Sequence, residues 1–156
     1  MYDSHEFPGP DPYWGATEHM GNENWLTSMI LGGVFERHPT LRMGVIENGA
    51  FWVGPLADRL DLWTGVFPTT SARTMTEKPS AYLARNVRVT PLYFEPVDEY
   101  FQRWPHLQDV YSFSSDYPHP EGGKHTAERQ YEKLIPLGTE LVDKYFTLNG
   151  ELLLPA

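Results

Sequence analysis

Two acidic residues, Glu47 and Asp116, stand directly after short apolar runs of the sequence. Glu47 ends the run over 43–46, and Asp116 follows the run over 110–115. Short apolar runs bounded by turn residues are typical of buried parallel strands. Loops at the carboxyl ends of such strands reach ligands, and a carboxylate there suits a divalent cation. Taken alone, either acid could equally cap a helix or stabilise a turn.

A histidine lies close to the second of these acids. His119 follows Asp116 by three residues and has a proline on each side, which restricts the conformations of the loop. Such a histidine is suited to contact a substrate or to hold another polar group of a site by a hydrogen bond. The alternative is that it only orders the loop. Ser114 and Ser115 form no nucleophilic triad with it, because the chain has no Gly-x-Ser-x-Gly elbow.

Alternating segments predict the frame that carries these residues. Apolar spacing predicts helices over 22–38, 50–63, 79–85, 96–101, 126–135 and 139–146, and strands over 41–47, 86–90 and 110–115. Residues 64–77, rich in Thr and Ser, are predicted to be a loop. The alternation favours an α/β fold with a parallel sheet and right-handed crossovers. Tyr93, just past the second predicted strand, is the aromatic residue best placed to line a pocket.

The composition limits the class of protein. The chain has 156 residues, enough for a single domain over 1–156 but fewer than the roughly 250 of a complete (β/α)8 barrel. Lys and Arg number 12 against 21 Asp and Glu, and the basic residues form no cluster, which argues against a nucleic-acid partner. No apolar run reaches the length of about 20 residues that spans a membrane. Without a signal-peptide pattern or any cysteine, we expect a cytoplasmic protein.

Two longer stretches resemble one family of enzymes. Residues 114–123 read SSDYPHPEGG, and residues 30–42 read ILGGVFERHPTLR and lead into ENGAFW at 47–52. The first resembles the strand-eight motif of amidohydrolase-related, decarboxylase-like metal enzymes, and the second resembles their helix-five signature. The resemblance covers nearly the whole chain from Ser4 onward. It implies the C-terminal portion of a (β/α)8 TIM-type barrel, about strands six to eight with their helices.

The resemblance also implies roles for individual residues. Asp116 matches the strand-eight aspartate, a metal ligand that takes a proton from metal-bound water. His5 matches the strand-five histidine ligand, and His19 is a rival for that role. The implied cofactor is a divalent metal, zinc first and manganese as the alternative, which activates water against a small organic substrate. Asp116, Glu47 and His119 are the candidate catalytic residues.

Two departures from the family pattern bear on the activity. No two histidines lie two residues apart, so the His-x-His pair of strand one is absent from this sequence. Glu47 begins Glu-Asn-Gly where decarboxylating members often carry His-Gly-Gly, which favours a hydrolase over a non-oxidative decarboxylase. The absent pair leaves a second hypothesis, a non-catalytic remnant that serves as a binding or oligomerisation module. Three parallel strands leave an open edge, so we expect a homo-oligomer or a missing N-terminal barrel segment.

Overall fold

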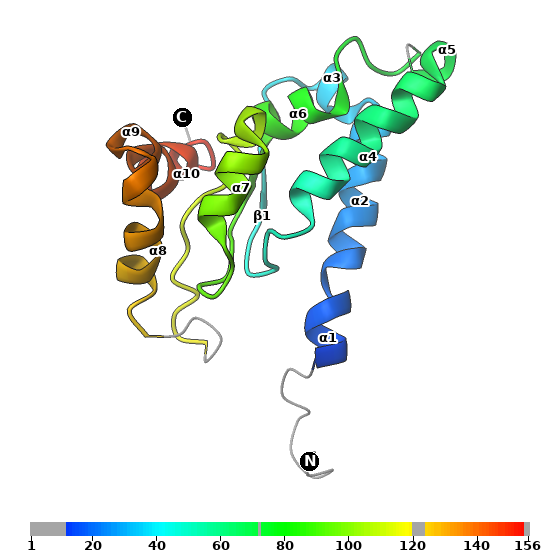
Figure 1. Cartoon of the computed structure of the whole chain (residues 1–156). Coiled ribbons are helices and arrows are strands. Elements are labelled where there is room, and N and C mark those ends of the chain that lie inside the picture. Colours follow the sequence, from blue (N-terminus) through cyan, green and yellow to red (C-terminus); the bar gives the residue numbers. More distant parts are fainter. Residues whose placement is uncertain (1–11, 72, 120–123, 155–156) are drawn as a thin grey trace.

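Two short parallel strands lie at the centre of the fold (Figure 1). β1 (Met43–Val45) pairs with β2 (Val87–Val89). A third segment lies along the other edge of β2, where Tyr111 forms a parallel bridge to Val89. The three segments therefore lie side by side in the order in which they occur along the chain. This mixed α/β arrangement confirms the predicted fold class.

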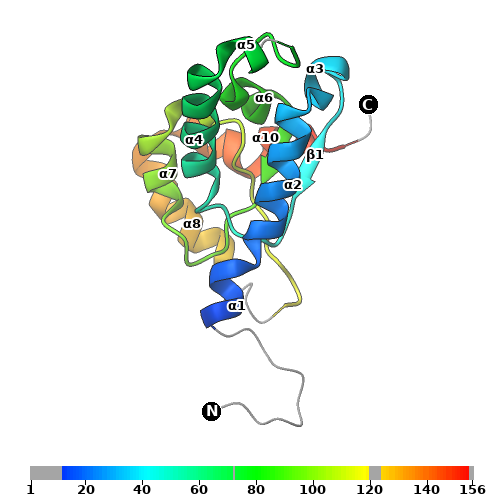
Figure 2. The ribbon, with the colours of Figure 1, turned by 90° about the vertical axis from the view of Figure 1, so that its right-hand side faces the viewer.

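The computed structural model describes residues 12–71, 73–119 and 124–154. Helices of several lengths surround the sheet: α1 (Pro12–Thr17), α2 (His19–Leu31), α3 (Val34–Arg37), α4 (Val53–Val66), α5 (Pro68–Ser71), α6 (Pro79–Asn86), α7 (Val97–Arg103), η1 (Pro105–Leu107), α8 (Thr126–Leu134), η3 (Ile135–Leu137), α9 (Thr139–Asp143), η4 (Lys144–Leu148) and α10 (Asn149–Glu151). α2 and α4 lie side by side (Figure 2), on the opposite side of the fold from α8 and α9 (Figure 1).

The third strand, predicted over 110–115, is shorter than expected. Only Tyr111 forms a bridge there, with the Val89 amide donating to the Val110 carbonyl (2.8 Å) and the Ser112 amide donating to the Val89 carbonyl (3.0 Å). The next amide, that of Phe113, donates to the carbonyl of Tyr145 (2.9 Å) instead. A segment at a sheet edge has a strand on one side only, so its backbone is free to bond to the neighbouring helix.

The helix predicted over 22–38 is divided into α2 and α3, so its continuity was predicted wrongly. Gly33 breaks it with a left-handed φ of 69°, a conformation that glycine adopts at little cost. A side chain at Gly33 would also collide with the carbonyl of Thr74. The predicted loop over 64–77 contains one helical turn, α5. The division at Gly33 arises where Thr74, distant in sequence, packs against the helix, a contact that local spacing does not report.

Aromatic side chains fill the space between the sheet and its helices. The ring of Tyr111 lies 5.6 Å from that of Tyr100 and 5.4 Å from that of Phe101. Trp104 packs directly on Gly54 of α4, where any side chain would overlap the indole ring. The glycine therefore lets α4 approach the end of α7 closely, and this close packing fixes the helix that follows the Glu47 turn.

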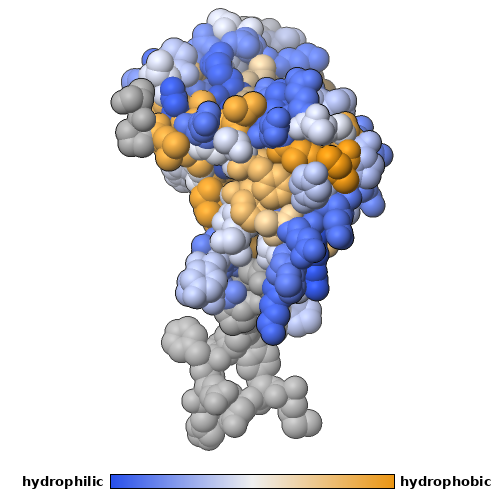
Figure 3. Space-filling view, turned by 90° about the vertical axis from the view of Figure 1, so that its left-hand side faces the viewer, coloured by the Kyte–Doolittle hydropathy of each residue, from blue (hydrophilic) through white to orange (hydrophobic). Residues whose placement is uncertain are grey.

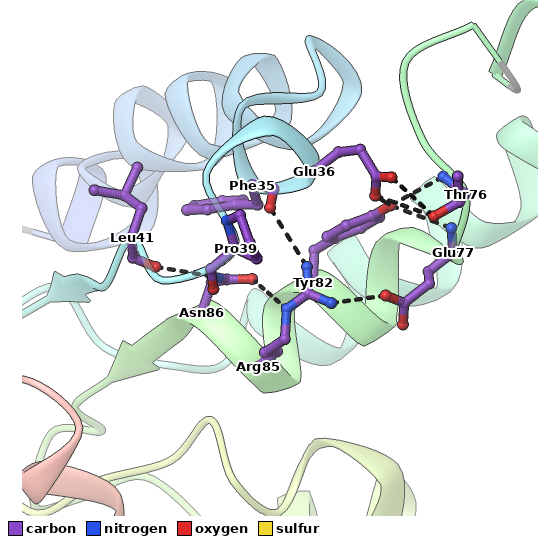
Figure 4. A network of polar contacts seen from close by, with 9 residues as sticks. All are labelled: Phe35, Glu36, Pro39, Leu41, Thr76, Glu77, Tyr82, Arg85 and Asn86. Atoms are coloured by element: carbon purple, nitrogen blue, oxygen red, sulfur yellow. Dashed lines mark hydrogen bonds and ion pairs between the residues drawn. The ribbon is translucent and has the colours of Figure 1, made fainter.

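A network of polar contacts fastens α3 and the chain before β1 to α6 (Figure 4). The Tyr82 hydroxyl donates to Glu36 (2.5 Å), and this bond lowers the pKa of the Glu36 carboxyl. Asn86, at the end of α6, donates to the carbonyls of Pro39 (3.0 Å) and Leu41 (2.8 Å). The beginning of β1 is thereby held beside the beginning of β2.

The C-terminal segment crosses all three strand segments. Arg88 of β2 donates through Nε to the Asn149 carbonyl (2.9 Å), and the Asn149 side chain donates to the Tyr111 carbonyl (2.8 Å). Arg42, just before β1, donates to the Leu152 carbonyl (2.8 Å). These bonds satisfy buried polar groups and fix the spacing of the three segments whose opposite ends carry the candidate site.

Hydrophobic residues also reach the surface on the side of the molecule where α8, α9 and α10 lie (Figure 3). On the third strand segment, Phe113 is only partly buried, with its ring 4.9 Å from that of Phe146.

Among the helices that the structure describes, none combines the length and the apolar character that a membrane span requires.

Candidate metal centre

Glu47, Asp116 and His119 come together at one edge of the sheet. One potential ligand atom from each lies within 4.8 Å of the others. The Nδ1 atom of His119 is 3.2 Å from Oδ1 of Asp116 and 3.5 Å from Oε2 of Glu47. Glu47 follows β1 and Asp116 follows the third segment, so the shared direction of parallel strands brings distant residues to the same edge.

The carboxylate of Asp116 is buried without a hydrogen-bond donor among the described residues. Its side chain is 6 % exposed, and neither of its oxygens has a hydrogen-bond partner within the described part of the chain. His119 is close enough for an ion pair, but the contact is not aligned as a hydrogen bond. Burying an anion in this way costs free energy unless a cation neutralises it. A positive charge beside Asp116 would therefore stabilise the site.

Tight turns present the two acids. Glu47 and Asp116 have left-handed backbones with φ of 60° and 55°, which is uncommon outside glycine. After Asp116 the chain turns at once, with the His119 amide donating to the Asp116 carbonyl (2.8 Å). The Ser114 hydroxyl accepts a bond from the Asp116 amide (3.3 Å), and the Tyr117–Pro118 peptide bond within this turn is cis. This turn brings the His119 ring back beside the Asp116 carboxylate.

The turn that carries Glu47 is held from outside. The Glu47 amide donates to the hydroxyl of Thr90, which directly follows β2 (3.1 Å). Three residues beyond Gly49, the Trp52 indole donates back to the Gly49 carbonyl (3.0 Å). The Ala50 amide lies 3.0 and 3.1 Å from the two carboxylate oxygens of Glu95. Burial raises the pKa of the Glu95 carboxyl.

Sequence reasoning missed Thr90 and Glu95. Thr90 closes the second predicted strand, a place where a polar residue is unremarkable, and Glu95 precedes a proline in an aromatic loop. Neither has a motif or spacing that marks it. Tyr93, in contrast, lines a pit of about 10 Å³ together with Glu47 and Asp116, as predicted. That volume is about the space of a single water molecule.

The two histidines proposed for strand five are not in this group. His5 lies outside the described residues. His19 begins α2 and is buried, with its ring against Phe51 (4.7 Å) and its Nε2 3.6 Å from Glu23. Burial lowers the pKa of His19. Its Nδ1 has no hydrogen-bond partner among the described residues, but His19 is not part of the Glu47, Asp116 and His119 cluster.

Comparison with known proteins finds similarity to solved structures. No protein-family model and no curated protein matches the chain. A solved structure, an amidohydrolase from Mycobacterium avium subsp. paratuberculosis K-10, is similar over 91% of the chain with a TM-score of 0.74 and 28% sequence identity. The chain has an amidohydrolase-like fold. It spans 36% of the length of that protein.

Proposed function

We propose that this chain is the C-terminal part of a metal-dependent hydrolase that acts on a small organic substrate. The observation that carries the proposal is the buried carboxylate of Asp116, whose oxygens have no donor among the described residues, beside Glu47 and His119. The similarity to an amidohydrolase structure supports a hydrolase-type function. On this proposal Asp116, Glu47 and His119 hold a divalent cation at the ends of the strands.

The donor atoms fit such a cation. Two carboxylates and one imidazole are ligands that zinc and manganese both accept, and zinc is the first candidate. Three protein ligands also match the number found in many catalytic zinc sites. His5, from outside the described residues, remains our proposed additional ligand. A bound cation of this kind lowers the pKa of water towards neutrality and so supplies a nucleophile.

The chain's own residues have distinct tasks in this proposal. Asp116 is buried and fixed by its turn, which suits it to bind the cation and to accept a proton on its second oxygen. Glu47 and His119 are about half exposed, with 45% and 53% of their side chains accessible. Both can therefore reach a substrate. The 3.5 Å separation of Glu47 Oε2 and His119 Nδ1 lets both atoms bind one cation at the distances usual for zinc.

A non-oxidative decarboxylase is the alternative chemistry. Glu47 stands where decarboxylating members of the amidohydrolase-related family, which the sequence resembles, often have a histidine. The chain therefore lacks that proton donor at this position. A carboxylate is a poorer partner for a substrate that is itself a carboxylate, because like charges repel. This observation favours hydrolysis, and product analysis separates the two: carbon dioxide release indicates decarboxylation, and addition of water indicates hydrolysis.

We further propose that this chain forms strands six to eight of a barrel, completed by a preceding segment or by another copy. β1 pairs on one edge only among the described residues. Along its other edge lies an open hollow of about 530 Å³, lined by Asn22, Trp25, Met43, Gly44, Val45 and Ile46. This exposed edge also favours the second candidate function, a binding or oligomerisation module. A monodisperse monomer in light scattering would contradict completion by another copy.

The proposed activity is tested by removing the metal and then Asp116. The protein, with any natural preceding segment, is stripped with a chelator and assayed on a panel of small esters, amides and lactones with added zinc or manganese. We expect turnover to require metal and to be lost in Asp116→Ala. Asp143→Ala, an exposed aspartate of α9, is the matched control and should retain activity. Full activity in Asp116→Ala would refute the mechanism.

A further inference from the structure

A second buried carboxylate, that of Glu95, lies behind the candidate site. Glu95 is 4 % exposed and, unlike Asp116, is surrounded by donors. Its oxygens accept bonds from the Leu92 amide (2.8 Å), the Tyr100 hydroxyl (2.7 Å) and the Ala50 amide. The donors come from the loop after β2, from α7 and from the turn after β1. Glu95 thus ties the stretch from Leu92 to Tyr100 to the turn after β1, whose Ala50 lies 45 residues earlier in the sequence.

One of these parts is the turn that presents Glu47. Two of its residues, Glu47 and Gly49, have left-handed backbones, so the turn has little intrinsic preference for its shape. Glu95 approaches it so closely that a side chain at Gly49 would place Cβ 2.8 Å from Oε1 of Glu95. Glycine at position 49 therefore allows both the left-handed turn and the close approach of the Glu95 carboxylate.

The loop that carries Glu95 is itself anchored to α8. Lys133 donates to the Glu95 carbonyl (2.7 Å), and the Gln130 side chain donates to the Leu92 carbonyl (3.4 Å). Gln130 is in turn held by the buried hydroxyl of Tyr145 (2.7 Å). The backbone around Glu95 is therefore held by α8, and the Glu95 carboxylate is a rigidly placed acceptor for the Ala50 amide.

The Glu47 side chain depends on such a support. It is 45% exposed, and its one ion-pair contact among the described residues is the 3.5 Å approach to His119, which is exposed as well. The position of its carboxylate is consequently set by its backbone. The backbone is held by Thr90 on one side and by Glu95, through Ala50, on the other.

We propose that Glu95 is a positioning residue that sets the place of the Glu47 carboxylate in the metal centre, an inference that rests on the proposed metal site. Loss of hydrogen-bonding groups behind metal ligands typically changes metal affinity by about 10-fold to 100-fold. Glu95 touches neither the cation nor the substrate, so it acts only through the turn. Its effect must therefore vanish when Glu47 is absent.

A double-mutant cycle tests this dependence. Zinc and manganese titrations are followed by calorimetry on the chelator-treated wild type, Glu95→Ala, Glu47→Ala and the double variant. We expect Glu95→Ala to weaken metal binding about tenfold in the wild-type background and to add nothing once Glu47 is alanine. Equal losses in both backgrounds would overturn the proposal.

A conservative variant separates geometry from charge. In Glu95→Gln one oxygen can still accept the Leu92 and Ala50 amides, while the new amide group can donate to the Tyr100 hydroxyl. Glu95→Gln should therefore restore most of the affinity that Glu95→Ala loses. Affinity as weak as in Glu95→Ala, in a protein that melts like the wild type, would mean that charge and not position matters, which would also overturn the proposal.

Two tyrosines provide a matched control. Tyr100→Phe and Tyr82→Phe each remove a hydroxyl that donates to a glutamate, but Tyr100 donates to Glu95, which holds the Glu47 turn, whereas Tyr82 donates to Glu36. Tyr100→Phe should weaken metal binding, and Tyr82→Phe should leave it unchanged even if both variants lose stability. Equal effects of the two on metal affinity would indicate a general structural cost and contradict positioning.

Failure of the metal site itself is recognisable separately. If the wild type binds neither ion, the proposed function fails, and positioning is then measured by nuclear magnetic resonance on the metal-free protein. Glu95→Ala should shift the Glu47 amide resonance and speed its hydrogen exchange, and Tyr82→Phe should do neither. An unchanged Glu47 amide in Glu95→Ala would refute positioning whatever the metal result.

Discussion

Glu47 and Asp116 adopt the same rare backbone conformation at the ends of the two strand segments that flank β2, with φ of 60° and 55°. Their carboxylates lie with His119 Nδ1 inside a group no more than 4.8 Å across. A left-handed backbone costs most residues other than glycine about 1–2 kcal/mol, and Asp and Asn less. Both acids are therefore kept where the backbone is unfavourable, as is common at functional sites.

Replacing Glu47 by glycine should separate stability from metal binding. Glycine adopts the left-handed backbone without strain, which stabilises the folded state, but it also raises the entropy of the unfolded chain. The net effect should be a rise of about 0.5–1 kcal/mol in the free energy of unfolding. Metal affinity should fall at least about tenfold because a ligand is lost. His125, with φ of 58° and outside the cluster, is the control: His125→Gly should gain stability and keep its metal affinity. Urea unfolding and calorimetry measure both quantities.

Asp116→Asn should stabilise the metal-free protein. Asparagine tolerates the left-handed backbone and removes a buried charge that has no hydrogen-bond donor among the described residues, so the free energy of unfolding should rise by about 1 kcal/mol. Added zinc should stabilise the wild type and not the variant, because ligand binding to the folded state alone raises stability. A variant that is less stable than the metal-free wild type would argue against an uncompensated carboxylate.

Two glycines of α4 should respond in opposite directions to alanine. At Gly54 the new methyl group would overlap the Trp104 ring, and we expect a loss of about 1–3 kcal/mol. At Gly65 nothing lies within 4 Å of an added Cβ, and alanine should gain about 0.5–1 kcal/mol through its better helix propensity. Chemical unfolding of the two variants is the measurement. Equal effects would show that α4 does not pack on Trp104.

His19 should make stability depend on pH. Burial lowers the pKa of His19 below its ordinary 6.5, so at lower pH the unfolded chain takes up a proton that the folded chain resists. The free energy of unfolding of the wild type, minus that of His19→Gln, should therefore fall as the pH drops below 6.5. Unfolding curves at a series of pH values measure this difference. A difference that rises in this range would mean that the Glu23 contact outweighs burial.

Much of the frame and part of the site could be predicted from the sequence. Apolar runs ended by Glu47 and Asp116 predict strands whose acids meet at one edge, and the structure brings these two together with His119. Pro79 marks the start of α6, because proline fits the first turn of a helix. These signals are local, so they can be read from neighbouring residues.

What the sequence did not reveal depends on distant partners. Gly33 divides a helix because Thr74 packs against it, and the segment after Tyr111 leaves the sheet to bond with Tyr145. Glu95 becomes recognisable only when the amide of Ala50, 45 residues earlier in the sequence, bonds to it. No spacing within the sequence encodes these contacts, and they come into view only once the chain is folded.

The location of a bound ion tests the central claim most directly. Crystals of the wild type grown with zinc would be measured at the zinc absorption edge, and an anomalous difference map would locate the metal. We expect a peak about 2.0–2.2 Å from a carboxylate oxygen of Asp116 and of Glu47 and from Nδ1 of His119, and no such peak in Asp116→Asn. A wild-type map without a peak at these residues, or a peak that persists in Asp116→Asn, would contradict the proposed metal centre.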